Sequence, residues 1–368
     1  MVRFFCVSAT ACIKVFIFIY IYKNFLELLL TVAKKTTIYD IAKELNITVS
    51  TVSRALNNIS SISDSTREAV VAMAKKMNYR PNKVASSLTS GKTYIIGVIV
   101  PSAQIHFFAT VVHALEKYLK RFGYSIILYQ SNESLESEQR GVDTLLEAQV
   151  DGIIASLSLE TDEVSHFEKV KEEGKPLLIF DRTHDLLRSP SVTIDDEYAG
   201  YMATKHLIDQ GYRKIAYITT THQIKIFQER YAGYQRAIKE AKLKLRPEFI
   251  ILGDLSVDGG FIGTNQLLQE KDRPDAIIGG DDFVALGIIK ALHKHEITPP
   301  TIGVIGFANQ SFSEHIIPSL TTIDQQAVQM GNECAKLFLK LLDKSKAIAP
   351  DEQVVLTPLL LERESTKK

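Results

Sequence analysis

The sequence contains few cysteines, and none of them is arranged for metal binding or for a disulfide framework. Cys6, Cys12 and Cys334 are the only ones among 368 residues, with no CxxC pair and no histidine and cysteine cluster at zinc-ligand spacing. The sequence therefore predicts no metal site and no cofactor. This cysteine content is typical of a protein in a reducing cytoplasm.

Sequence motifs that mark common enzyme sites are also absent. The chain has no GxGxxG, no phosphate-binding GxxxxGK[ST] loop and no GxSxG. His293 and His295 lie on a predicted surface helix, while Asp195 and Asp196 are typical of a strand-to-helix cap. We therefore predict that the chain is not an enzyme. An enzyme that modifies sugars is the alternative, and the missing motifs argue against it.

The chain as a whole carries no excess of charge of either sign. Its 43 lysine and arginine residues balance 43 aspartate and glutamate residues, so no overall basic field indicates nucleic acid. The basic residues are nevertheless concentrated locally, because residues 34–92 contain ten of them against four acidic ones. Such a local excess is typical of a small DNA-binding segment.

A hydrophobic run long enough to cross a bilayer is missing, although residues 1–35 are strongly apolar. Lys14 interrupts this segment, and the unbroken run Val15–Tyr22 is shorter than the roughly 20 residues that a span needs. A central lysine costs roughly 2.5–3.5 kcal/mol on insertion scales. We interpret residues 1–35 as an apolar extension that reflects a non-native start or a tail, with a membrane anchor as the alternative.

Residues 36–80 contain three short helical patterns, each with its own start signal. Thr37 begins the first with a capping box, Thr48 caps a second that ends near Leu56, and Ser63 caps a third that ends before Pro81. Apolar residues recur at helical spacing in each pattern. The segment therefore predicts a compact three-helix head.

The first two of these helices fit a helix-turn-helix, in which the second helix enters the DNA major groove. Its apolar residues lie on one side and short polar residues on the other, which places Val49, Ser50 and Arg54 against base edges. A second group lies where it could hold phosphates: Thr37, Tyr39, Thr51, Ser53 and Asn57. A three-helix bundle with a merely polar surface remains the alternative.

From residue 93 onward, apolar strand-like runs alternate with amphipathic helical stretches, after a linker over residues 81–92. Nine such runs exceed one sheet core, which favours an α/β body of two lobes with doubly wound parallel sheets. We assign the body to residues 93–365. Lobe one is predicted at about 93–193 and 300–324, and lobe two at about 194–299 and 325–365.

The segments TTIYDIAKELNITVSTVSRALNN and ISDSTREAVVAMAKKMNYRPNKVASSL resemble the head of the lactose/galactose repressor family. Later segments extend the resemblance over about residues 36–365: VDGIIASLS, PLLIFDR, RYAGY, GGDDFVALG, IGVIGFANQS, PSLTTIDQ and LLLERES. The resemblance implies a homodimeric regulator, usually a repressor, that binds a pseudo-palindromic operator. Its body is implied to be periplasmic-binding-protein-like and to bind a small molecule, often a sugar, between the lobes.

The resemblance also gives the linker a function. It implies that residues 81–92 fold into a hinge helix on operator DNA, and that Leu88 wedges into the minor groove. The alternative is that Val84 and Leu88 pack on the body. The sequence lacks the heptad extension of tetrameric relatives, so a dimer is expected.

Candidate effector-binding residues lie at the carboxyl ends of predicted strands, where open α/β sheets bind ligands. Arg230 and Asp282 could hold the vicinal hydroxyls of a sugar through charge-assisted hydrogen bonds. Phe107 and Phe108 could line the pocket, and Ser158 could offer a hydroxyl. The alternatives are an N-cap for Asp282, a salt bridge within the lobe for Arg230, and core packing for the aromatic pair.

The chain departs from the family at positions around this cleft. His106 stands where a proline is common, Leu255 where an aromatic ring is common, and Ile224 and Ile226 where some relatives have polar ligand contacts. The effector is therefore expected to be partly apolar or to be held mainly from the other lobe. An exported solute-binding protein and a membrane-tethered regulator remain the two rival interpretations, and a solute-binding protein has no use for a DNA-binding head.

Overall fold

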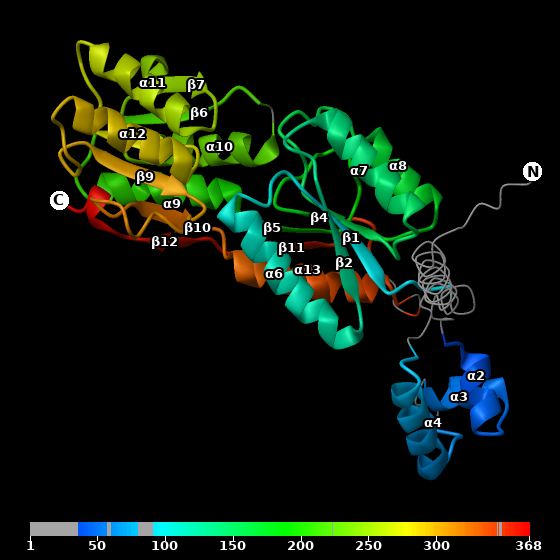
Figure 1. Cartoon of the computed structure of the whole chain (residues 1–368). Coiled ribbons are helices and arrows are strands. Elements are labelled where there is room, and N and C mark those ends of the chain that lie inside the picture. The colour runs from blue at the N-terminus through cyan, green and yellow to red at the C-terminus, as the bar shows by residue number, and fades with distance from the viewer. Residues whose placement is uncertain (1–35, 57–59, 80–90, 223, 344, 346–347) are drawn as a thin grey trace, which may run out of the picture. The chain divides into compact units, whose positions relative to one another are not determined.

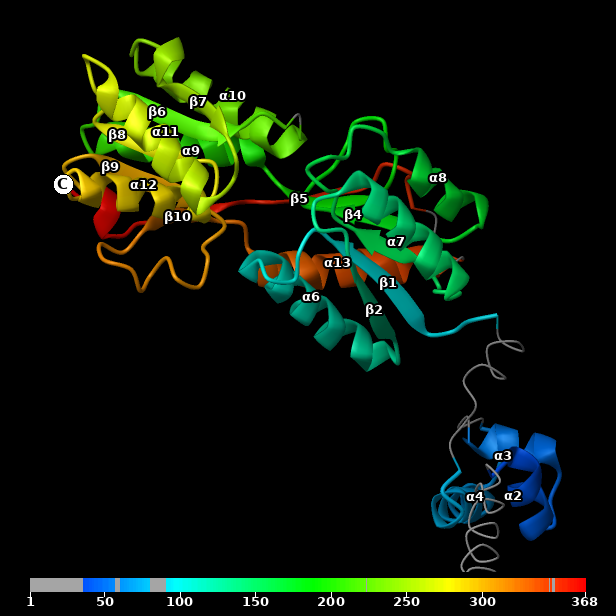
Figure 2. The same ribbon diagram turned by 45° about the horizontal axis from the view of Figure 1, so that its top comes forward.

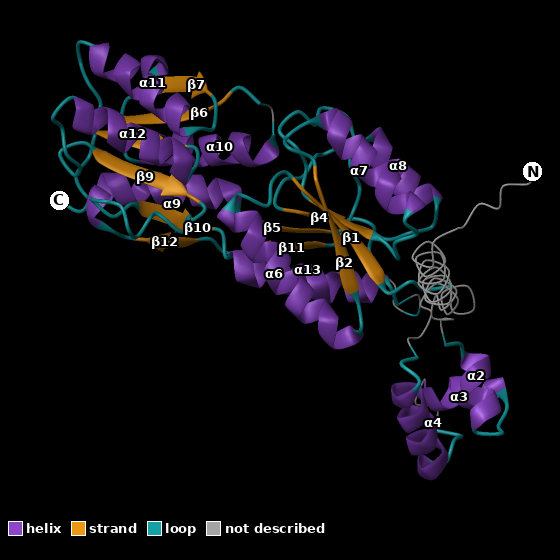
Figure 3. Cartoon of the chain, viewed as in Figure 1, coloured by secondary structure: helices purple, strands orange, loops and turns teal. Residues whose placement is uncertain are grey.

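The structure, a computed structural model, describes residues 36–56, 60–79, 91–222, 224–343, 345 and 348–368. The chain divides into two compact units, Met1–Gly91 and Lys92–Lys368. Figure 1 follows the chain by colour, and Figure 3 separates its helices from its strands. No described helix has the length and apolar character needed to span a membrane, and residues 1–35 lie outside the described residues.

The first unit contains the three predicted helices, α2 (Ile38–Glu44), α3 (Val49–Leu56) and α4 (Asp64–Lys76). Their apolar faces meet in one small core, formed by Ile41, Ala42, Val52, Ala55, Val70 and Ala74. A single short helix cannot bury its apolar face alone, so packing of all three stabilises each of them.

The predicted start signals of these helices are confirmed. The hydroxyl of Thr37 accepts a hydrogen bond from the Asp40 backbone N–H in a complete capping box, and that of Ser63 accepts one from Thr66. Between α2 and α3, Asn46 adopts a φ of +50°, a conformation that asparagine tolerates better than most residues. The tight turn therefore follows from the local sequence.

The second unit contains two six-stranded sheets, each at the centre of one lobe. The sheet of lobe one has the order β11 (Gln353–Leu356), β5 (Ser191–Ile194), β4 (Leu177–Phe180), β3 (Ile153–Ala155), β1 (Ile95–Val100) and β2 (Ser125–Gln130). The sheet of lobe two has the order β12 (Leu359–Leu361), β10 (Thr321–Asp324), β9 (Gly303–Phe307), β8 (Ala276–Gly279), β6 (Ile215–Thr220) and β7 (Ile250–Gly253). All pairings are parallel except that of β12 with β10, which is antiparallel.

Helices cover both faces of each sheet, as Figures 1 and 2 show from two directions. Lobe one has α6 (His106–Leu119) and α13 (Ala327–Leu341) on one face, and α7 (Leu135–Glu147) and α8 (Ser165–Glu172) on the other. Lobe two has α9 (Asp196–Asp209) paired with α10 (Lys225–Glu240), and α11 (Val257–Gln269) paired with α12 (Asp282–Lys294). This two-lobed, doubly wound architecture confirms the predicted fold class.

The predicted assignment of segments to lobes is wrong at two places. Residues 300–324 belong to lobe two, because β9 pairs with β8 and β10 with β9. Residues 325–356 belong to lobe one, because β11 pairs with β5 and α13 packs on α6. Strand pattern indicates that a strand forms but not which distant strand it joins, and the chain passes between the lobes three times, after β5, β10 and β11.

The nine predicted strands are all present, and β10, β11 and β12 are additional. These three have only three or four residues each, and β10 and β11 contain threonine, aspartate or glutamine rather than a continuous apolar run. β10 and β11 are therefore too short and too polar to stand out from their neighbours in the sequence, whereas β12 is apolar but has only three residues.

Candidate functional site

The helix α3 presents two chemically different sides. Val52 and Ala55 are 0% and 1% exposed in the core of the head, whereas Ser50 and Arg54 are exposed. Thr48 fixes the start of the helix, since its Oγ1 accepts a hydrogen bond of 3.1 Å from the Thr51 backbone N–H. The helix contains no acidic residue, so its outer side can approach a polyanion without like-charge repulsion.

The other residues predicted to contact DNA differ in their surroundings. Tyr39 is 70% exposed on α2, while Val49 is partly buried and packs against the head core. The hydroxyl of Thr37 lies 2.7 Å from the Asp40 carboxylate, and that of Thr51 lies 2.9 Å from the Thr48 hydroxyl. Ser53 is half-buried. The predictions for Asn57 and Leu88 lie outside the described residues.

Arg54 is available for an external partner. Within the part of the chain that the structure describes, its guanidinium forms no hydrogen bond or ion pair, whereas Arg67 of the same unit bonds Asp64 at 2.6 Å. An exposed arginine in the second half of a helix with apolar residues behind it has the geometry required to reach a base edge.

In the second unit, Arg230 on α10 lies at the centre of a buried group of charges. Its Nε donates to Asp196 Oδ1 at 2.7 Å and its Nη1 to the Gly280 carbonyl at 3.3 Å. The guanidinium carbon lies 4.6 Å from the ring centre of Phe307. Its Nη2 is buried without a partner among the described residues, so one N–H direction remains for a ligand.

The two adjacent aspartates that follow β8 have different roles. Asp281 is the N-cap of α12, and its Oδ1 accepts a hydrogen bond from the Val284 backbone N–H at 2.8 Å. Asp282 is fully buried, and its carboxylate accepts three hydrogen bonds within lobe two, from the Gln310 N–H and from the Ser313 and Thr322 hydroxyls. The N-cap role considered for Asp282 therefore belongs to Asp281. Asp282 instead connects α12 to the loop after β9 and to β10.

On the side of lobe one, Asp181 and Arg182 follow β4 and are both buried. Asp181 accepts a hydrogen bond from the Gln325 amide at 2.9 Å, and Arg182 donates to Glu133 at 2.6 Å. The guanidinium carbon of Arg182 lies 5.5 Å from the ring centre of Phe108. Its Nε has no partner among the described residues. Lobe one thus contributes Asp181 and Arg182 to this region, and lobe two contributes Arg230 with Asp196 and Asp281.

Burial dominates the electrostatics of these carboxyl groups. Burial raises the pKa of Asp181, although Arg182 and Arg230 lower it, and burial likewise raises the pKa of Asp196 against the pull of Arg230. Burial raises the pKa of Asp281 to about 6, with Arg230 and Arg182 acting in the opposite sense. Because Arg182 of lobe one lowers the pKa of Asp281 in lobe two, these charges share one low-dielectric region between the lobes.

A cavity of about 410 Å³ lies between the lobes beside these charges. Residues from both lobes line it, including Asp181 from lobe one, and Asp196, Ile226 and Glu229 from lobe two. Its size falls in the range of roughly 300–1,000 Å³ that is usual for small-molecule sites. The five effector-binding residues predicted from the sequence do not line this cavity, but Arg230 holds the Asp196 that does.

The remaining sequence-predicted effector residues are buried in the interior. Phe107 and Phe108 are 3% and 2% exposed in the main core cluster, which supports the core-packing alternative. Ser158 is fully buried, and its hydroxyl lies 3.0 Å from Glu138 and 2.7 Å from Ser131. Sequence reasoning missed Asp181, Arg182 and Asp281, although their position directly after strands β4 and β8 was a signal available for all three.

Two family models match the chain. Residues 93–356 match the periplasmic binding proteins and sugar binding domain of the LacI family, and residues 37–82 match the bacterial regulatory proteins of the lacI family. Among curated relatives, catabolite control protein A of Priestia megaterium is 34% identical over 90% of this chain and 99% of its own. The HTH-type transcriptional repressor PurR of Haemophilus influenzae (strain PittEE) is 31% identical over 90% of this chain and 98% of its own.

Solved structures agree with these matches. The lac repressor dimer bound to operator and the anti-inducer ONPF superposes with a TM-score of 0.79 at 26% identity, covering 90% of this chain and 99% of that one. The transcription regulator CcpA of Lactococcus lactis superposes with a TM-score of 0.68 at 29% identity, covering 74% and 99%.

A helical DNA-reading head joined to a two-lobed ligand-binding body defines a class, that of DNA-binding transcriptional regulators controlled by small molecules. Within that class, the chain belongs to the LacI family of bacterial regulatory proteins. It therefore regulates transcription through a DNA-binding head and a small-molecule-binding body, as the resemblance in the sequence implies. Members of this family are DNA-binding regulators rather than enzymes.

Proposed function

We propose that α3 lies in the major groove of a pseudo-palindromic operator, with Ser50 and Arg54 at base edges. The observation that carries this proposal is the two-sided character of α3: its inner side is buried, while its outer side exposes no acidic residue and an arginine that pairs with none of the described residues. Thr37, Tyr39, Thr51, Ser53 and Asn57 contact phosphates in this proposal, and Val49 supports the helix from behind. Residues 36–80 form the DNA-binding domain and residues 81–92 the hinge, with Leu88 as the minor-groove wedge.

The chain acts in the cytoplasm as a repressor without enzymatic activity. Three observations support this part of the proposal: the family consists of DNA-binding regulators, the sequence carries no common catalytic motif, and no described group of histidine, cysteine and acidic residues could hold a metal ion.

The effector binds between the lobes, in the cavity beside Asp181, Asp196 and Arg230. Asp281 takes the role that the sequence suggested for Asp282, because all three hydrogen bonds to the Asp282 carboxylate come from lobe two itself. Each sugar hydroxyl both donates and accepts, so it can accept from a guanidinium N–H and donate to a carboxylate. Arg182 and Arg230 each offer a buried unpartnered N–H for this purpose.

The charge of this region favours an uncharged effector over an anionic one. The carboxyl groups of the buried Asp181 and Asp196 and of the half-buried Asp281 outnumber the two guanidinium groups of Arg182 and Arg230, and Glu133 already pairs with Arg182. Adding a phosphate to a low-dielectric site that already contains excess carboxylate is costly. The proposed effector is therefore a neutral polyhydroxylated molecule with a small apolar part that faces Ile226.

A thermal-shift series tests this assignment. Full-length protein is heated with neutral hexoses and pentoses and with their matching phosphates, because a ligand that binds only the folded state raises its apparent stability by about 2.7 kcal/mol at 100 times its Kd. We expect stabilisation by a neutral sugar and loss of that stabilisation in Asp181→Asn. Asp143→Asn, on the exposed outer side of lobe one, is the matched control. A larger shift with a sugar phosphate would contradict the neutral-ligand assignment.

A further inference from the structure

An apolar cluster joins the two lobes directly. Ile224, Ile226 and Phe227, which are 3%, 5% and 6% exposed, pack together at the start of α10 in lobe two. Leu159, from the loop after β3 in lobe one, packs against them together with Leu255 of lobe two. This set is the interlobe cluster; Leu255 also packs against the core of lobe two, whereas its other four members belong to no other hydrophobic cluster of the described residues. Leu159 is its only described member from lobe one.

An ion pair accompanies the interlobe cluster. Lys225, at the start of α10, donates from Nζ to Asp185 Oδ1 of lobe one at 2.7 Å. The two side chains are 39% and 79% exposed, so water and salt screen this interaction strongly. Water and salt do not screen the apolar contact of the partly buried Leu159, which is therefore the stronger of these two connections between α10 and lobe one.

The backbone that carries Leu159 is held by two carboxylates, those of the partly buried Glu133 and of the buried Glu138. The Leu159 backbone N–H donates to Glu133 Oε2 at 2.9 Å, and the Ser158 backbone N–H donates to Glu138 Oε2 at 2.7 Å. Because both amides end on carboxylates, these hydrogen bonds are charge-assisted and stronger than neutral ones. The position of Leu159 is thus fixed from two directions before it touches the other lobe.

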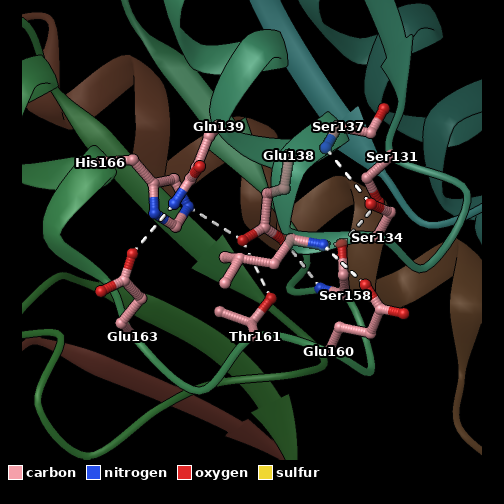
Figure 4. Close-up of polar contacts among 11 residues, drawn as sticks. Ser131, Ser134, Ser137, Glu138, Gln139, Ser158, Glu160, Thr161, Glu163 and His166 are labelled. Atoms are coloured by element: carbon pink, nitrogen blue, oxygen red, sulfur yellow. Dashed lines mark hydrogen bonds and ion pairs between the residues drawn. The ribbon is translucent and has the colours of Figure 1, made fainter.

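Glu138 organises most of this loop, as Figure 4 shows. It is fully buried on α7, and its Oε1 accepts from the Thr161 hydroxyl and from His166 Nε2, each at 2.9 Å. Its Oε2 lies 3.0 Å from the Ser158 hydroxyl, whose single proton is shared between Glu138 Oε2 and the Ser131 Oγ at 2.7 Å.

Four donors converge on this one side chain from α8 and from the loop after β3. If Glu138 were removed, the buried N–H and O–H groups of Ser158, Thr161 and His166 would lose their common acceptor. A glutamine of the same shape could not replace Glu138, because only a carboxylate has two oxygens that can accept from all four donors at once. The loop would therefore lose the arrangement that presents Leu159.

We propose that Leu159 is the residue through which lobe one closes on lobe two, and that Glu138 is the positioning residue that presents it. Ile226 of the interlobe cluster also lines the cavity proposed for the effector. The inference rests on the proposed function only where it calls this cleft the effector site. The protein closes without a bound effector, and the effector acts on an existing equilibrium between open and closed lobes.

Distance measurements between spin labels test this proposal. Cysteines at Glu136 and Asp258 carry the labels, since both residues are exposed near the starts of α7 and α11, the helices that follow β2 and β7. Cys6 and Cys12 are changed to serine in the full chain, and Cys334 is buried and stays. We expect a predominantly short distance in the absence of any ligand. A predominantly long distance would overturn the proposal.

Two leucine substitutions in lobe one separate closure from general destabilisation. Leu159→Ala removes apolar atoms from the lobe-one side of the interlobe cluster, whereas Leu146→Ala removes the same atoms from the core of lobe one, outside that cluster. We expect Leu159→Ala to raise the ratio of open to closed protein about tenfold, or about 1.4 kcal/mol. Leu159→Met, which conserves volume, and Leu146→Ala should both leave the ratio near that of the wild type. An equal effect of the two alanine variants would contradict the assignment to Leu159.

A double-mutant cycle tests the positioning role of Glu138. Glu138→Ala should open the lobes as Leu159→Ala does, and it should open them no further when Leu159 is already alanine. If Glu138→Ala does not fold, Glu138→Gln, which keeps the shape but offers one acceptor oxygen, replaces it with the same expectation. Additive opening in the double variant would overturn the role of Glu138. These distances involve neither DNA nor effector, so failure of the proposed function would be seen separately, in operator binding.

Discussion

At the scale of single residues, the region between the lobes contains charged groups that are buried but only partly paired. Arg230 and Arg182 each have one carboxylate partner and one nitrogen without a partner among the described residues, while Asp282 has three donors. Leaving such donors unsatisfied is costly in a folded protein, and it persists where a ligand completes the set. The partner of each arginine and aspartate therefore matters more for ligand binding than the number of charged residues in this region.

Asp282 makes the stability of the body depend on pH. Burial raises the pKa of Asp282 from an ordinary value of 3.8 to about 7, against the hydrogen bonds from Ser313, Thr322 and the Gln310 N–H. Between these two pH values the folded state keeps a proton that the unfolded state has released. The stabilisation is therefore complete below about pH 4 and is lost as the pH rises through 7.

Chemical denaturation of the wild type and of Asp282→Asn at several pH values measures this effect. We expect the wild type to lose up to about 1.4 kcal/mol per pH unit relative to the variant between pH 5 and pH 7. The neighbouring Asp281 also raises the pKa of Asp282, so both proteins carry Asp281→Asn in this comparison. A difference in unfolding free energy that does not change with pH would show that Asp282 is ionised throughout this range.

At the scale of elements, the position of Arg230 depends on how closely α9 and α10 approach. A Cβ added to Gly200 of α9 would lie 1.9 Å from the Arg230 carbonyl oxygen, and one added to Gly233 of α10 would lie 1.9 Å from the Glu197 carbonyl oxygen. These two glycines let the helix backbones touch, which brings Arg230 within 2.7 Å of Asp196.

Gly200→Ala should therefore destabilise lobe two and disturb the effector site together. Backbone atoms cannot give way as a side chain can, so we expect a loss of about 1–3 kcal/mol or more in unfolding free energy. Gly263→Ala on α11 is the control, because its Cβ would meet only side-chain atoms of Ile218 and Ile251 and would gain helix propensity. Denaturation curves for the two variants that coincide would contradict the close approach.

Most helices and strands of this protein could be predicted from the sequence, but the strands and side chains that they contact could not. Thr37, Thr48 and Ser63 specify the starts of three helices through local hydrogen bonds, so the head could be predicted from the sequence. The functional difference between Asp281 and Asp282 could not, because a shift of one residue along a helix start turns a side chain from the helix cap into the core. Periodicity does not resolve such a shift.

At the scale of the whole molecule, the same limit applies to the lobes. The expected division placed β9 and β10 in lobe one and α13 and β11 in lobe two, the reverse of what the sheets contain. Pairing of β11 with β5 joins residues about 160 positions apart, and no local pattern encodes such a contact. The resemblance to a known family predicted the architecture correctly, whereas the path of the chain between the lobes required the structure.

Regulation in this molecule requires that closure of the lobes and DNA binding by the head be coupled. An effector changes operator affinity only by as much as its affinity differs between the two lobe arrangements, typically a coupling of about 1–3 kcal/mol. The interlobe cluster around Leu159 sets where this equilibrium stands before the effector binds. Regulation of transcription also requires that α3 recognise a particular DNA sequence.

Competition binding of the full chain to its selected operator, and to variants with single base-pair changes, tests this recognition most directly. We predict that Arg54→Ala costs about 1–3 kcal/mol at the operator and removes the preference at one base pair of each half-site. Lys75→Ala, which removes an exposed basic residue from α4, should change affinity without changing any preference. An equal loss for Arg54→Ala on every sequence would show that Arg54 contacts phosphate alone and that α3 does not read bases through it.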